Sequence, residues 1–180
     1  LALLLAHWTV YSARAALSRF QDSRAAYLNE LPPADSGRQE TFDHWQIGFT
    51  AMGRALAENT DPEASIAVLP IGRIGFYSQL RVIDMAGVVD STIAHSAFDP
   101  RFVATWRPGH DKGDGLYILS RKPDYIQLVD RLTTQPMPEP DAHGMQYKSV
   151  FDLWHAPEFH RDYEFYPIQL EGGWHYNLYR

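Results

Sequence analysis

The sequence of 180 residues contains no cysteine. This absence excludes disulfide bonds, thiolate ligands for metals and cysteine nucleophiles, but it does not identify the compartment. The sequence also has no cluster of Lys and Arg residues, and its formal net charge is −6. Since nucleic-acid binding depends on a concentrated basic surface, we predict no nucleic-acid partner.

Several motifs of known chemistry are also missing. The phosphate-binding pattern GxxxxGK[ST], the nucleophile pattern GxSxG and the zinc pattern HExxH do not occur. His155 and His160 are separated by Pro157, so they do not share one helix face as two zinc ligands would. From these patterns we assign no metal ligand and no cofactor to the chain.

The first six residues, LALLLA, are apolar but far fewer than the about 20 that a membrane-spanning helix needs. Apolar residues recur at helical spacing up to about residue 31, where Pro32 and Pro33 prevent continuation. We therefore predict a long helix over residues 1–31. Two interpretations of its start remain open: an ordinary buried helix, or the end of a transmembrane segment or signal peptide.

Residues 32–180 are predicted to form a single α/β domain. The hydrophobic fraction of 45% and the aromatic fraction of 13% are typical of a packed globular protein, and the α/β class follows from the alternation of predicted helices and strands. The apolar run SIAVL, residues 65–69, is typical of a strand buried on both faces. A short helix or turn over residues 71–80 and a strand ending at Asp84 complete a βαβ pattern.

Further along, a helix over residues 115–121 and a strand over residues 125–129 repeat the alternation. The segments YEFYPIQL and WHYNLYR, separated by EGG, are predicted to form a β-hairpin that closes the chain. The predicted fold is a three-layer-like α/β sandwich with a mostly parallel sheet, a long N-terminal helix and a C-terminal β-hairpin.

Two polar stretches stand at predicted strand ends or helix starts, where open α/β sheets place ligand crevices: RVIDMAGVVDSTIAH (residues 81–95) and PGHDKGDG (residues 108–115). Asp84 and Asp90 could act as an acid/base pair or hold a divalent cation. The alternative is structural, because Asp is also a common residue in turns and at helix N-caps.

The second stretch is predicted to be a polar loop that ends in a helix cap at Asp114. In this loop His110 and Lys112 could meet a ligand or a neighbouring carboxylate. Tyr77 is an aromatic residue that could stack on a sugar ring, although most aromatic residues belong to the core or its rim.

Residues 72–95 and 108–126, about a quarter of the chain, resemble a signature of the soluble C-terminal extracytoplasmic domain of bacterial multi-pass membrane glycosyltransferases. The nearest relatives by this resemblance are arabinofuranosyltransferase-like proteins that use polyprenyl-phosphate sugar donors. The resemblance implies a protein of the bacterial inner membrane, with this domain facing the periplasm or cell exterior. It also implies that the catalytic acidic residue lies outside these 180 residues.

The expected role is therefore to bind a glycan acceptor or to cover the membrane-embedded active site, with an envelope glycan or lipid-linked sugar as partner. The chain would contact the membrane through helices that precede it. The candidate ligand-binding residues are Tyr77, Asp84, Asp90, His110, Lys112 and Asp114.

Two alternatives remain. One is a free-standing periplasmic enzyme that uses Asp84 or Asp90 with His110 for acid/base or metal-assisted hydrolysis. The other is a structural module that docks other envelope proteins through its aromatic surface.

Overall fold

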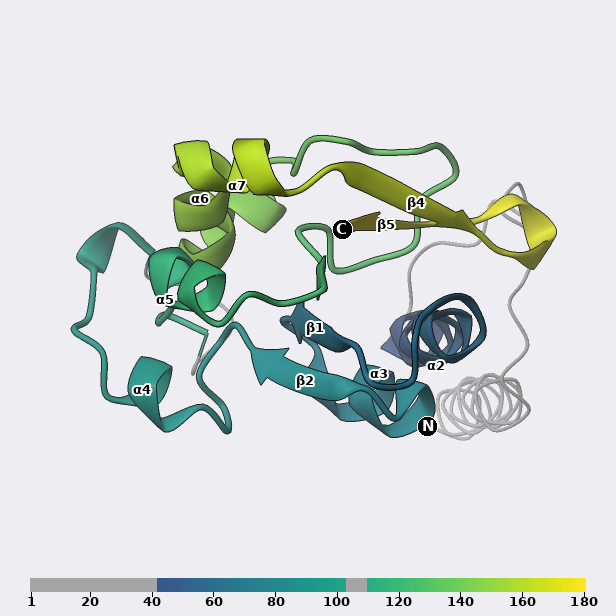
Figure 1. The fold of residues 1–180 in the computed structure, drawn as a ribbon, viewed down its shortest axis with the longest axis horizontal. Coiled ribbons are helices and arrows are strands. Elements are labelled where there is room, and N and C mark those ends of the chain that lie inside the picture. The colour runs from purple at the N-terminus through teal and green to yellow at the C-terminus, as the bar shows by residue number, and fades with distance from the viewer. Residues whose placement is uncertain (1–41, 103–109) are drawn as a thin grey trace, which may run out of the picture.

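A computed structural model describes residues 42–102 and 110–180, so the helix predicted for residues 1–31 lies outside the described part. The fold is mixed α/β, with a five-stranded sheet in the order β2-β1-β3-β5-β4 (Figure 1). The strands are β1 Ser65–Val68, β2 Arg81–Asp84, β3 Tyr125–Ile126, β4 Phe165–Gln169 and β5 His175–Tyr179.

The sheet is mixed rather than mostly parallel as predicted. Strand β1 lies parallel to both β2 and β3, whereas β5 lies antiparallel to β3 and β4. The predicted hairpin is confirmed, because β4 and β5 pair from Phe165↔Tyr179 to Gln169↔His175. Its turn needs positive φ angles, and Gly172 and Gly173 supply them with φ values of 75° and 82°.

The strand predicted over residues 125–129 is shorter than expected. Strand β3 has only two residues, because β5 pairs with it only through Tyr179, the last residue of β5. Residues 127–130 leave the sheet but remain buried, and the chain returns to β5 by a bridge between Thr133 and His175. The apolar residues that follow β3 reflect burial of this segment and not a longer strand.

Six helices surround the sheet, within the residues that the structure describes. They are α2 Phe42–Asn59, α3 Ile71–Ser78, α4 Ser91–Ala94, α5 Gly115–Ser120, α6 Lys148–His155 and α7 Pro157–Asp162. Three 3-10 turns add η1 Pro100–Phe102, η2 Gly144–Gln146 and η3 Glu171–Gly173. No helix in the described ranges is long and apolar enough to span a bilayer.

The sheet separates two hydrophobic clusters. Successive side chains of a strand point to opposite faces, so Ile66 and Val68 of β1 enter one cluster and Ala67 enters the other. The first cluster includes Met52 and Leu56 of α2 and Ile74 of α3. The second includes Ile118 of α5, Leu153 of α6 and Phe159 of α7. This double burial explains the uninterrupted apolar run of β1.

Candidate functional site

Asp84 ends β2 and is 2% exposed. Its Oδ1 accepts hydrogen bonds from the backbone N–H groups of Ala86 at 2.9 Å and Gly87 at 3.1 Å. Its Oδ2 accepts from the N–H groups of Val89 at 2.6 Å and Asp90 at 3.3 Å. One carboxylate therefore holds the whole loop from β2 to α4 in place, and both of its oxygens are occupied.

Asp90 caps α4, which confirms its structural interpretation. Its Oδ1 accepts from the N–H groups of Thr92 at 2.9 Å and Ile93 at 3.1 Å. Its Oδ2 accepts from the hydroxyl of Tyr117 on α5 at 3.0 Å and lies 3.6 Å from the guanidinium of Arg121. The carboxylate thus joins α4 to α5.

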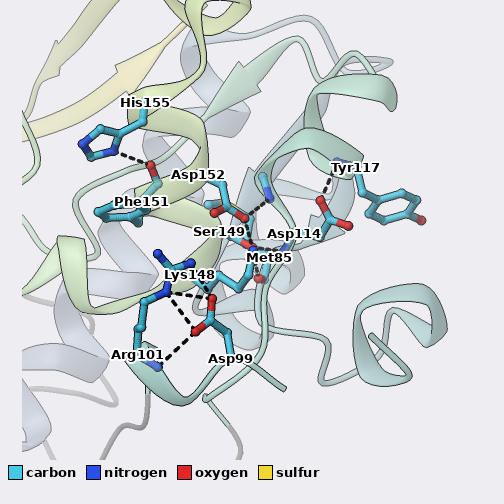
Figure 2. A network of polar contacts seen from close by, with 11 residues as sticks. Met85, Asp99, Arg101, Asp114, Tyr117, Lys148, Ser149, Phe151, Asp152 and His155 are labelled. Carbon is cyan, nitrogen blue, oxygen red and sulfur yellow. Dashed lines mark hydrogen bonds and ion pairs between the residues drawn. The ribbon is translucent and has the colours of Figure 1, made fainter. Parts of the chain in front are cut away.

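Asp114 caps α5 as predicted, because its Oδ1 accepts from the N–H of Tyr117 at 2.9 Å. Its own N–H donates to the hydroxyl of Ser149 on α6 at 2.9 Å. Figure 2 shows that hydroxyl between Asp114 and the carbonyl of Met85, to which it donates at 2.7 Å. The buried Ser149 therefore connects the end of β2, the start of α5 and α6.

Helix α6 packs directly against the loop before α5. A Cβ atom on Gly113 would lie 2.5 Å from the backbone nitrogen of Ser149, and one on Gly115 would lie 2.6 Å from the Cβ of Asp152. Asp152 Oδ2 accepts from the N–H of Gly115 at 3.2 Å and pairs with Lys148 (Figure 2). Neither Ser149 nor Asp152 was predicted from the sequence to belong to this cluster. The glycines of PGHDKGDG were the available signal, since they indicate a close approach of backbone.

Lys112 and His110 complete the loop. The ammonium group of Lys112 donates to the carbonyl of Ala94 at the end of α4. Nδ1 of His110 is buried and has no hydrogen-bond partner in the described part of the protein. The His110 ring lies 6.3 Å from the ring of Tyr147. Lys112 therefore makes a second link between the two polar stretches.

Tyr77 lies elsewhere. It belongs to α3, where it packs against α2: the guanidinium carbon of Arg54 lies 5.4 Å from its ring centre, and a Cβ on Gly53 would be 2.7 Å from its Cβ. Its ring also contacts that of Phe76, edge to face at 5.1 Å. Hydrogen bonds therefore join four of the six predicted residues, Asp84, Asp90, Lys112 and Asp114, into one unit. His110 lies in the same loop without a hydrogen bond from Nδ1, and Tyr77 lies apart on the α2–α3 contact.

Three exposed apolar side chains adjoin this cluster in the chain. Val88 and Val89, in the loop that Asp84 holds, are 62% and 73% exposed. Leu116, next to Tyr117 on α5, is 61% exposed. Val89 precedes Asp90 and Leu116 precedes Tyr117, and the hydrogen bond between Asp90 and Tyr117 brings these two segments together. We call these three exposed side chains, Val88, Val89 and Leu116, the apolar rim of the cluster.

A second polar pair, Asp130 and His143, lies beyond β3 and outside the two polar stretches. Oδ2 of the buried Asp130 lies 3.5 Å from Nε2 of His143. The edge of the His143 ring faces Tyr147 at 5.7 Å. Across the described residues, no group of three or more His, Asp or Glu side chains is placed to hold a metal ion.

A family model described as a domain of unknown function (DUF8728) matches residues 38–179, more than three quarters of the chain. The chain belongs to this family. The matched range includes every helix and strand named above. No curated protein and no solved structure matches the chain.

Proposed function

We propose that this member of the DUF8728 family is the extracytoplasmic domain of a polytopic glycosyltransferase in the bacterial inner membrane. It faces the periplasm or cell exterior and binds an envelope glycan or lipid-linked sugar, or covers the membrane-embedded active site. The helix predicted for residues 1–31 leads from the last membrane-spanning segment into a three-layer sandwich. Transfer of the sugar takes place in the preceding, membrane-embedded part of the protein.

One observation carries this proposal: the two stretches that resemble the glycosyltransferase signature form one hydrogen-bonded unit. Asp90 reaches Tyr117, and Lys112 reaches Ala94. The acidic residues of the unit bind backbone N–H groups, four of them at Asp84. Such a unit supports recognition or covering by a rigid surface, without a reaction of its own.

The apolar rim favours covering at this end of the domain. Val88, Val89 and Leu116 lie exposed beside the bonded unit, although most exposed loop residues are polar. An apolar rim of this kind suits contact with a surface that is itself apolar, such as protein loops at the edge of a bilayer. A polar sugar chain would gain little from these three side chains.

The rival hypothesis, a free-standing hydrolase that uses Asp84 or Asp90 with His110, gains less from the geometry. A general base needs a lone pair that faces the proton it removes. Each oxygen of Asp84 already accepts two N–H groups, and each oxygen of Asp90 accepts at least one hydrogen bond. The buried Nδ1 of His110 is the one feature that favours this rival.

The test is sugar transfer by the full-length membrane protein, assayed with polyprenyl-phosphate sugar donors. Replacing both Val88 and Val89 by Ser is expected to lower transfer about tenfold or more, because each lost apolar contact costs about 1 kcal/mol. The control is Phe76→Ser, since Phe76 is 70% exposed on α3. Transfer by the isolated 180-residue chain, or equal effects of the valine and Phe76 changes, would contradict the proposal.

A further inference from the structure

An open hollow of about 360 Å³ lies away from the two polar stretches, where three segments converge. Its lining comes from the end of α5 and the turn before β3 (residues 119 and 122–124), the end of α7 (residues 162–163) and Arg180 after β5. Ligand pockets in proteins usually measure about 300–1,000 Å³, so the volume suits one or two sugar rings.

The hollow is held in shape by its own contacts. The hydroxyl of Tyr163 donates to the carbonyl of Pro123 at 2.8 Å, which ties α7 to the turn before β3. The Tyr163 ring stacks on the buried ring of Phe159, with centroids 5.7 Å apart and planes inclined by 15°. Glu164 and Arg180 exchange two backbone hydrogen bonds of 2.9 Å. An aromatic side chain is thus fixed in the wall of a preformed cavity.

The charges of the lining balance. Lys122 and Arg180 supply two cations, and Asp124 and Asp162 supply two carboxylates. A simple anion would meet the carboxylates and a simple cation would meet Lys122 and Arg180, so neither gains a net attraction. A neutral ligand with hydroxyl groups avoids this conflict, because each hydroxyl both donates and accepts hydrogen bonds.

Lys122 occupies a backbone position that favours glycine. It follows Arg121, the C-cap of α5, and has a φ of 49°, a left-handed conformation that is uncommon for residues other than glycine. Gln79 has the same conformation after α3, with a φ of 58°, and does not line the hollow. Lys122 therefore places a long cationic side chain, in the position after a helix where glycine is usual, among the residues that line the hollow.

We propose that this hollow binds a saccharide, with the aromatic edge of Tyr163 and the ammonium group of Lys122 as its main contacts. That the sugar belongs to an envelope glycan rests on the proposed function. The saccharide site itself does not depend on the proposed function, because it is inferred from the hollow, its balanced charge and the conformation of Lys122. The domain would then hold a glycan at one place and cover the active site at another.

The experiment is an NMR titration of the 180-residue chain, labelled with 15N, against the methyl glycosides of glucose, galactose, mannose and arabinose. Glycine and inorganic phosphate serve as zwitterionic and anionic comparison ligands. We expect saturable shifts at residues 119–124, 162–163 and 180, with a Kd of roughly 1–10 mM for at least one glycoside. Glycine and phosphate should shift these signals much less.

Variants separate binding from folding. Lys122→Gly removes both the ammonium group and the backbone strain, so it should raise Tm by about 2–4 °C and weaken glycoside binding about tenfold. Gln79→Gly should raise Tm similarly and leave binding unchanged. Lys122→Asn tolerates the same backbone conformation and should also weaken binding, whereas Lys122→Arg should retain it.

The outcomes are distinct. Unchanged glycoside binding in Lys122→Gly, tighter binding of glycine or phosphate, or no shift at about 50 mM glycoside would overturn the saccharide site. Shifts centred on residues 84–95 and 110–117 would overturn it too, while leaving the proposed function standing. If the chain binds a glycoside in the hollow but the full-length protein transfers no sugar, the saccharide site stands and the proposed function is refuted.

Discussion

The hydroxyl of Tyr117 donates a hydrogen bond to Oδ2 of Asp90 across 3.0 Å, and so joins α4 and α5 through two residues 27 positions apart in the sequence. The other oxygen of Asp90 caps α4, while the N–H of Tyr117 binds the cap of α5, Asp114. Each helix is short, and α4 has only four residues. Since isolated helices of this length are unstable in water, these cross-links stabilise both helices together with the burial of Ile93 and Ile118 in the core.

Asp84→Asn should destabilise the protein by about 2–3 kcal/mol, because the amide NH2 would face two of the four backbone N–H donors that Asp84 now accepts. The measurement is urea unfolding followed by circular dichroism. Asp90→Asn is the matched control. Asn caps helices about as well as Asp, and the hydroxyl of Tyr117 can accept from the amide, so its cost should stay below about 1 kcal/mol. Equal costs for both variants would show that the loop does not depend on Asp84.

Gly115→Ala should cost about 1–3 kcal/mol, because its Cβ would lie 2.6 Å from the backbone nitrogen of Leu153 and 2.8 Å from the carbonyl of Ser149. Gly72→Ala, in α3, has no atom within 4 Å of the added carbon and should stabilise the protein by about 0.5–1 kcal/mol. Thermal unfolding of both variants checks the pair. A Gly115→Ala protein as stable as the wild type would mean that α6 does not approach this loop closely.

Ser65→Ala should lower stability by about 1–2 kcal/mol at neutral pH, because the Ser65 hydroxyl donates to the Asp124 carboxylate at 2.7 Å. The two hydrogen bonds from Ser65 hold the pKa of Asp124 below its usual value. The pKa of Asp124 is therefore lower in the folded protein than in the unfolded chain, where it is about 3.9. The stability that this difference contributes is fully present above about pH 3.9 and is lost as the pH falls through the folded pKa.

The difference between Ser65→Ala and the wild type should therefore shrink as the pH falls below the unfolded pKa of about 3.9. Urea midpoints measured at pH 7 and at low pH provide the comparison. A difference that stays constant over this range would assign the effect to packing around the buried Ser65 rather than to the charged carboxylate.

Tyr176→Phe should leave stability unchanged or raise it by about 1 kcal/mol. The Tyr176 hydroxyl is fully buried and has no hydrogen-bond partner among the described residues, and its burial raises its pKa. Tyr179→Phe is the control, because the Tyr179 hydroxyl donates to the carbonyl of Pro138 and its loss should cost about 1 kcal/mol. A clear loss of stability in Tyr176→Phe would reveal a partner for its hydroxyl, such as a bound water.

Local features of the sequence were sufficient for several elements. The cap at Asp114, the buried β1 and the final hairpin were predicted and are confirmed, and the cap at Asp90 confirms the structural alternative for that residue. Each depends on residues within a few positions of one another: a carboxylate before a helix, an apolar run between prolines, or two alternating segments around glycines.

The role of Ser149 could not be predicted in this way. Its hydroxyl binds Met85, 64 positions earlier, and Asp114, 35 positions earlier. The glycines beside Asp114 indicate a close approach of some segment, but no local pattern identifies that segment as α6. The same holds for Tyr163 and Arg180, which line the hollow with residues 122–124 only because α7 and β5 end beside that turn.

By itself, the sequence determined the types of element and the residues that cap them, because capping and periodic burial act over one or two turns of chain. Only the tertiary structure decided that both oxygens of Asp84 and of Asp90 accept hydrogen bonds, that Tyr77 lies apart, and that β5 makes the sheet mixed. The physical reason is that a side chain's available hydrogen bonds depend on which distant segments fold against it.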